Sequence, residues 1–130
     1  MKIMVCYDGS NVAKAALKIA KKHANAFNAQ VSVVTSHESV SESKVKETER
    51  AEQDLENVKK SFEEDKIPCD THLLIRGIGA GEDLVQFADE NKIDQIIIGT
   101  RRRSKVGKLL FGSVAQYVII NASCPVLSVK

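Results

Sequence analysis

Five short apolar runs alternate along this chain with segments whose apolar residues recur at helical spacing. A short apolar run bounded by turn residues is typical of a strand that is buried on both faces. Successive parallel strands need a crossover between them, which is usually a helix. The sequence therefore predicts an α/β fold with an open parallel five-stranded sheet and helices on both faces. The strands are expected at residues 3–7, 31–35, 71–75, 95–98 and 125–129.

Right-handed crossovers restrict how five parallel strands can be ordered. We expect the order 3-2-1-4-5, in which the direction of winding reverses between the first and the fourth strand. Ligands bind at such a reversal, outside the carboxyl ends of the strands. The loop after Tyr7 and the loop after Ile98 are therefore expected to lie side by side. Residues 1–130 fit one domain, since no linker or internal repeat interrupts the pattern.

The segment 41–66 is expected to be one long surface helix. Fifteen of its 26 residues are charged, which excludes a central strand. Six uncharged residues recur there at helical spacing and predict one narrow buried stripe. They are Val45, Thr48, Ala51, Leu55, Val58 and Phe62. Further helices are predicted after an N-cap at Ser10 or Asn11, at 82–91 and at 113–121. The segment Gly77-Ile-Gly-Ala-Gly81 is expected to be a flexible turn.

Composition limits the cellular compartment in which the protein is expected and the classes of partner that it can bind. A net charge of only +2 argues against general coating of nucleic acid, and few aromatic residues accompany the basic ones. No apolar run approaches the roughly 18 residues that cross a bilayer, and the first residues do not resemble a signal peptide. We therefore expect a cytoplasmic protein without a membrane partner. The three cysteines are far apart and predict buried free thiols, because neither disulfide nor metal-ligand spacing is present.

The stretch from Gly99 to Ser113 joins the fourth apolar run to the last helix and carries five basic side chains. Free N–H groups at a helix N-terminus, together with the Ser113 hydroxyl, can hold a phosphate. A cap made by Ser113 alone, or a solvated basic loop, would also explain these residues. The stretch is not a Walker loop, because Arg102 stands where its first glycine belongs and Leu109 follows Lys108.

Asp8 directly follows the first apolar run. A carboxylate there can accept hydrogen bonds from ribose hydroxyls or help to hold a metal. Asp8-Gly9-Ser10 is equally ordinary turn chemistry, so both interpretations stay open. No pairing of a nucleophile with a base can be assigned from residue order. The residues therefore support a binding protein and give an enzyme function only weak support.

These residues resemble the universal stress protein family over essentially the whole chain. The resemblance rests on the segments 3–10, 96–100, 110–115 and 124–130. It implies a Rossmann-like, adenine nucleotide α-hydrolase-like fold and a small cytoplasmic protein of the stress response. It further implies that ATP or AMP is bound, with Mg²⁺ if the ligand is ATP.

The resemblance also implies where the nucleotide would lie. Asp8 would approach the ribose and phosphates, and Ser36 and Ile98 would lie near the adenine. The phosphate path would be lined by Gly99, Gly112, Ser113 and Val114.

In the ATP-binding branch of the family, a glycine stands where this chain has Arg102. Arginine resists the left-handed backbone that glycine adopts, yet its guanidinium can pair with a phosphate. An alternative is therefore a member that binds no nucleotide and acts through an unknown protein partner.

The family also pairs through its last strand. Pro125–Val129 is the predicted edge strand here, and an exposed apolar edge favours pairing with a second copy. We therefore expect a homodimer. A third possibility is an adenylating enzyme of the related α-hydrolase group. Such enzymes usually carry a Ser-Gly-Gly-x-Asp-Ser loop after the first strand, which Tyr7-Asp-Gly-Ser10 does not match.

Overall fold

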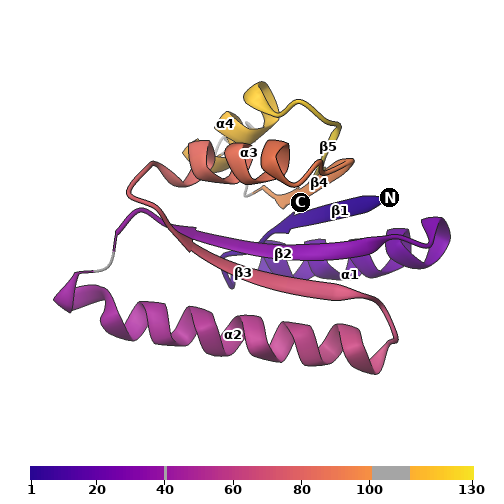
Figure 1. The fold of residues 1–130 in the computed structure, drawn as a ribbon, viewed down its shortest axis with the longest axis horizontal. Helices are drawn as coiled ribbons and strands as arrows, with labels where there is room; N and C mark the ends of the chain where they lie inside the picture. The colour runs from indigo at the N-terminus through magenta and orange to yellow at the C-terminus, as the bar shows by residue number, and fades with distance from the viewer. Residues whose placement is uncertain (40, 101–111) are drawn as a thin grey trace.

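A computed structural model describes residues 1–39, 41–100 and 112–130. Its sheet has five parallel strands in the order β3-β2-β1-β4-β5, which confirms the predicted class and order (Figure 1). The observed bounds extend several of the predicted ones by one or two residues: β1 Lys2–Cys6, β2 Gln30–His37, β3 Cys69–Ile75, β4 Gln95–Gly99 and β5 Val126–Val129.

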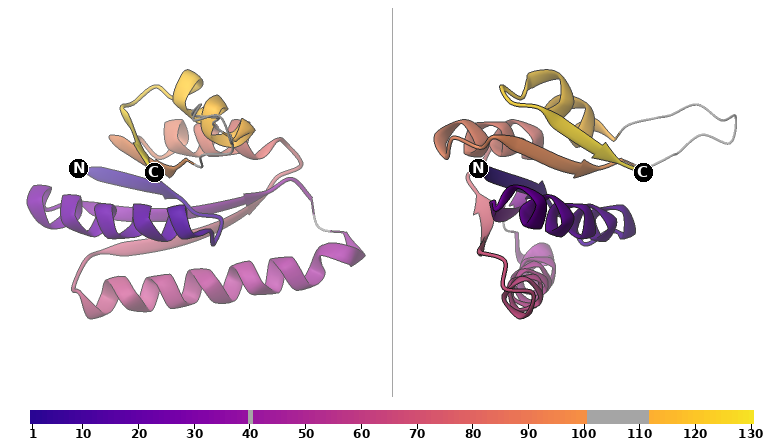
Figure 2. Two further views of the ribbon diagram at one scale, coloured as in Figure 1. Left: turned by 180° about the vertical axis from the view of Figure 1, so that it is seen from behind. Right: turned by 90° about the vertical axis from the view of Figure 1, so that its right-hand side faces the viewer.

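Helices cover both faces of the sheet, as Figures 1 and 2 show. One face carries α1 and α2, and the other carries α3 and α4. Within the described residues no helix combines the length and the apolarity needed to span a bilayer. The helix bounds are α1 Asn11–Phe27, α2 Val45–Glu64, α3 Ala80–Glu90 and α4 Ser113–Asn121, and a short 3₁₀ helix at Glu42–Lys44 precedes α2.

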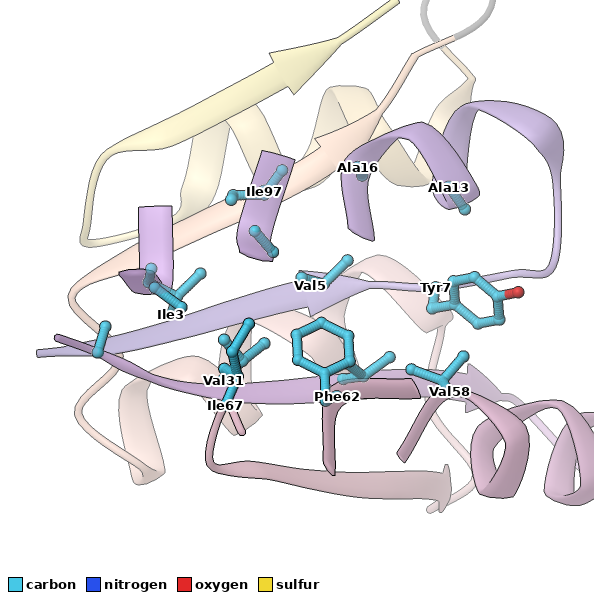
Figure 3. Close-up of a cluster of buried hydrophobic side chains, with 14 of the residues drawn as sticks. Ile3, Val5, Tyr7, Ala13, Ala16, Val31, Val58, Phe62, Ile67 and Ile97 are labelled. Atoms are coloured by element: carbon cyan, nitrogen blue, oxygen red, sulfur yellow. The ribbon is translucent and has the colours of Figure 1, made fainter. Parts of the chain in front are cut away.

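Two apolar cores follow from the alternation of side chains along the strands. On β1, Ile3 and Val5 face α1 and α2, whereas Met4 and Cys6 face α3 and α4. Figure 3 shows the first core, in which Phe62 of α2 packs below the sheet. Small side chains let α1 lie close to the strands, since its buried residues are Ala13, Ala16, Ala20 and Ala24.

Two sequence predictions about helices are corrected. The α2 stripe is buried only at Leu55, Val58 and Phe62, whereas Val45 is 42% exposed. The reason is visible in Figure 1, where the N-terminal end of α2 extends past the strands and has no sheet to pack on. Gly81 is not in a turn but in α3, where a Cβ would come within 2.9 Å of Cβ of Tyr117. This glycine therefore lets α3 and α4 pack closely.

All three cysteines are free thiols. Cys6 is buried, and Cys69 and Cys124 are half-buried, so the predicted burial is complete only for Cys6. Burial raises the pKa of the Cys6 thiol to about 12 and that of Cys69 also to about 12. Because the thiolate is the reactive form, these two cysteines are structural rather than nucleophilic.

Candidate functional site

A pocket of about 510 Å³ opens at the carboxyl ends of the strands, where the winding reverses between β1 and β4. Its walls come from the loop after β1, the ends of β2 and β4, the first turns of α2 and the start of α4. Arg102 lies outside the described residues. The other predicted site residues all line this pocket: Asp8, Ser36, Ile98, Gly99, Gly112, Ser113 and Val114.

The loop after β1 forms a tight turn that starts α1. Gly9 has a φ of +80°, a left-handed conformation that favours glycine. Ser10 caps α1, because its Oγ accepts a hydrogen bond from the Ala13 amide at 3.2 Å. The Asp8 carboxylate accepts from the Ser10 amide at 3.0 Å and remains exposed at the rim of the pocket. Asp8 therefore shapes the turn while it faces the pocket, so the two interpretations of this residue are compatible.

The N-terminus of α4 faces the pocket. Its N-cap is Gly112, not Ser113, and Gly112 has no side chain to occupy the first amides. Ser113, Val114 and Ala115 form the first turn, and all three line the pocket. The first amides of a helix have no partner within it and carry partial positive charge. This end of the pocket is therefore suited to a phosphate group.

The two glycines of the predicted phosphate path differ in the space that surrounds them. A Cβ on Gly99 would lie 2.8 Å from the carbonyl carbon of Val12, so the start of α1 occupies that space. A Cβ on Gly112 would have no described atom within 4 Å, and its φ of −61° suits any residue. Gly99 is thus required by packing, whereas the space beside Gly112 is open to a ligand.

Apolar side chains and a hydroxyl also line the pocket. Val34, Leu84 and Ile98 line it, and the last two are 4% and 5% exposed. Apolar side chains of this kind suit the face of a ring. At the end of β2 the half-buried Ser36, which also lines the pocket, donates a hydrogen bond from Oγ to Oδ2 of Asp83 at 2.8 Å. The pocket therefore offers both an apolar surface and a hydroxyl oxygen.

Comparison with known proteins decides the family. The model of the universal stress protein family matches residues 1–130. The chain belongs to the universal stress protein family. A universal stress protein of Methanocaldococcus jannaschii is 37% identical over 143 residues, which cover 99% of this chain and 81% of that one.

Two solved structures of universal stress proteins from Archaeoglobus fulgidus are also similar. One has a TM-score of 0.90 and 36% identity and covers 100% of this chain and 98% of the other. The second was solved in complex with dAMP and has a TM-score of 0.84 and 32% identity, with the same coverage. The order of elements described above is therefore the Rossmann-like order of this family.

Some pocket residues of this universal stress protein were missed from the sequence. Glu47, Arg50 and Asp54 of α2 line the pocket, and Asp54 lies beside the loop after β1. Burial, and next the Asp54 and Asp8 carboxylates, raise the pKa of Tyr7 there. The spacing of three and four residues puts these α2 side chains on one helix face. That signal alone does not distinguish a pocket wall from a solvated face.

A second missed group is the buried Asp83 on α3. Its side chain is 0% exposed and pairs with Nε of Arg76, which follows β3. Arg76 also donates from Nη2 to the Asp83 carbonyl oxygen at 3.2 Å and from Nη1 to Glu90 at 3.1 Å. A buried carboxylate needs such partners to offset its desolvation. This pair holds the start of α3 against the ends of β2 and β3.

One carboxylate of the pocket, that of Asp8, could help to hold a metal. Among the described residues no group of three or more His, Cys, Asp or Glu side chains converges on one point. Zinc and iron sites need such groups, whereas Mg²⁺ is commonly held by one or two carboxylates together with ligand phosphates. The rim carboxylate of Asp8 fits the second arrangement.

Proposed function

We propose that this universal stress protein binds an adenine nucleotide, AMP or ATP, in the pocket between the loop after β1 and the start of α4. The observation that carries the proposal is the N-terminus of α4, whose N-cap Gly112 has no side chain and whose first residues line a pocket that also has apolar walls. The related Archaeoglobus fulgidus protein solved in complex with dAMP supports it.

Each predicted residue receives a role in this proposal. The amides of Ser113 and Val114 hold a phosphate, with Gly112 leaving room for it, and Gly99 shapes the adjoining wall. Asp8 accepts hydrogen bonds from the ribose and, with ATP, holds Mg²⁺ together with the phosphates. Ile98 and Ser36 contact the adenine. Arg102 pairs with a phosphate through its guanidinium.

The proposal is one of binding with little or no intrinsic hydrolysis. The residues proposed to hold the phosphate through their amides, Ser113 and Val114, are not general bases at neutral pH, and the Asp8 carboxylate is engaged with the ribose and Mg²⁺. We propose that the protein works in the cytoplasm during stress as a homodimer. A protein partner would bind it according to whether the nucleotide is present.

The deciding experiment blocks the phosphate end without disturbing the fold. Gly112→Val puts a side chain into open space at an extended N-cap, so we expect at least a tenfold loss of AMP and ATP affinity by calorimetry. Gly79→Val is the matched control, because Gly79 is also an extended N-cap with open space but does not line the pocket. Equal binding by both variants, or no binding by the unmodified protein with Mg²⁺ present, would refute the proposal.

The alternative member that binds no nucleotide is favoured by Arg102. Arg102→Gly restores the glycine of the ATP-binding branch. If the unmodified protein binds no ATP and this variant does, Arg102 blocks the site and the protein-partner function is correct. If the variant binds ATP more weakly, Arg102 is a phosphate ligand.

A further inference from the structure

The hydroxyl of Ser36 has a fixed direction of donation. Ser36 Oγ lies 2.8 Å from Oδ2 of Asp83, while Oδ1 of the same carboxylate accepts from Nε of Arg76. A carboxylate in an ion pair can only accept hydrogen bonds. The single hydroxyl hydrogen of Ser36 must therefore point to Asp83, away from any ligand.

Ser36 lines the pocket, and this direction of donation leaves only the lone pairs of its hydroxyl available to a ligand. A hydroxyl has one hydrogen and two lone pairs, and the hydrogen is already used. Asp83 is fully buried and held at two points by Arg76, so the arrangement does not depend on a mobile surface group. Ser36 consequently offers the pocket an acceptor and no donor.

We propose that Ser36, positioned by Asp83, accepts a hydrogen bond from the exocyclic amine of a bound adenine and so selects purines with an amine at that position. The inference rests on the proposed nucleotide function. In adenine joined to ribose, this amine carries the only N–H hydrogens of the base. A purine with a carbonyl in its place would set two acceptors against each other, which costs affinity because neither is satisfied.

Two ligands that differ only in the amine test the inference. AMP carries it, and purine riboside 5′-monophosphate has a hydrogen instead. We expect the unmodified protein to bind AMP about three- to tenfold more tightly, which is the usual net effect of one hydrogen bond. In Ser36→Ala this ratio should fall close to one, whereas Ser36→Thr keeps the hydroxyl and should keep the ratio. The measurement is the dissociation constant of each ligand by calorimetry.

Asp83→Asn tests the positioning role. An amide can donate to Ser36, which frees the serine hydrogen to turn toward the pocket. We expect the preference for AMP over inosine 5′-monophosphate, which has the carbonyl, to weaken in this variant. A merely structural role of Asp83 would lower both affinities alike. If the variant does not fold, the two Ser36 variants decide the question alone.

Ser113→Ala is the matched control, since it removes a hydroxyl from the phosphate end and should leave the ratio of affinities unchanged. An unchanged ratio in Ser36→Ala would overturn the selection by Ser36 and leave the proposed function intact. Failure of every purine nucleotide to bind the unmodified protein would overturn both.

Discussion

At the scale of single residues, Gly99 and Gly112 show how one motif can combine two physical causes. A Cβ at Gly99 would lie 2.8 Å from the carbonyl carbon of Val12, so the packing of α1 on β4 requires a glycine there. Gly112 has a backbone conformation open to any residue and no described neighbour on that side. Substitution at the first therefore acts on the fold, and substitution at the second acts on the ligand.

The prediction for these glycines is a contrast in stability. Gly99→Ala forces α1 or β4 to shift, and overpacking of this kind costs about 1–3 kcal/mol. Gly112→Ala should change the free energy of unfolding by less than about 0.5 kcal/mol, because the added methyl group has no described atom to meet. Urea unfolding of both variants without ligand is the measurement. Equal stability of the two would contradict the packing argument.

The Asp83 pair is the residue-scale feature that the sequence concealed. In the sequence Asp83 is one charged residue among several in the segment 82–91, which is predicted to be a helix. Its burial depends on Arg76, which is close in sequence but reaches it only because the turn after β3 brings the guanidinium over α3. Beside it, Leu84 and Phe87 are buried in the second core. Such pairings depend on spatial neighbours that periodicity does not reveal.

At the scale of elements, the type and order of the strands could be predicted because each is a short apolar run bounded by turn residues. The order β3-β2-β1-β4-β5 follows from handedness, and it places Asp8 beside the end of β4. The ends of the elements could not be predicted as closely as their type. β2, for example, continues past the predicted Thr35 to His37, because its polar Ser36 still pairs within the sheet. Which face of α2 lines the pocket depends on where the helix overhangs the sheet, and its sequence is charged on every exposed side.

The overhang of α2 yields the element-scale prediction. Phe62 is 0% exposed in the first core, so Phe62→Ala should lower the free energy of unfolding by about 3–5 kcal/mol. Val45, at the predicted start of the same stripe, is 42% exposed, and Val45→Ala should change it by less than about 0.5 kcal/mol. Thermal or urea unfolding distinguishes the two. A large loss for Val45→Ala would mean that the first turn of α2 is covered by something else.

At the scale of the whole molecule, exposed apolar side chains gather on α4, which carries four of the eight large ones exposed among the described residues. β5 lies at the edge of the sheet, as predicted. Its apolar residues Val126, Leu127 and Val129 are half-buried. On α4, Tyr117 is 39% and Ile120 is 69% exposed. Large apolar side chains grouped beside an edge strand mark interaction sites more often than single exposed residues do. This is the surface at which the proposed homodimer would form.

The dimer prediction follows from that surface. Ile120→Lys puts a charge where the second copy would bury an apolar side chain, so we expect the molar mass by light scattering to fall from that of two chains to that of one. Val45→Lys is the matched control, because Val45 is 42% exposed on α2, which packs on β3 at the opposite edge of the sheet from β5. The control should stay dimeric, and a dimeric Ile120→Lys would remove α4 from the interface. Because α4 also presents its N-terminus to the pocket, dissociation that weakens AMP binding would mean that pairing helps to hold the phosphate end in place.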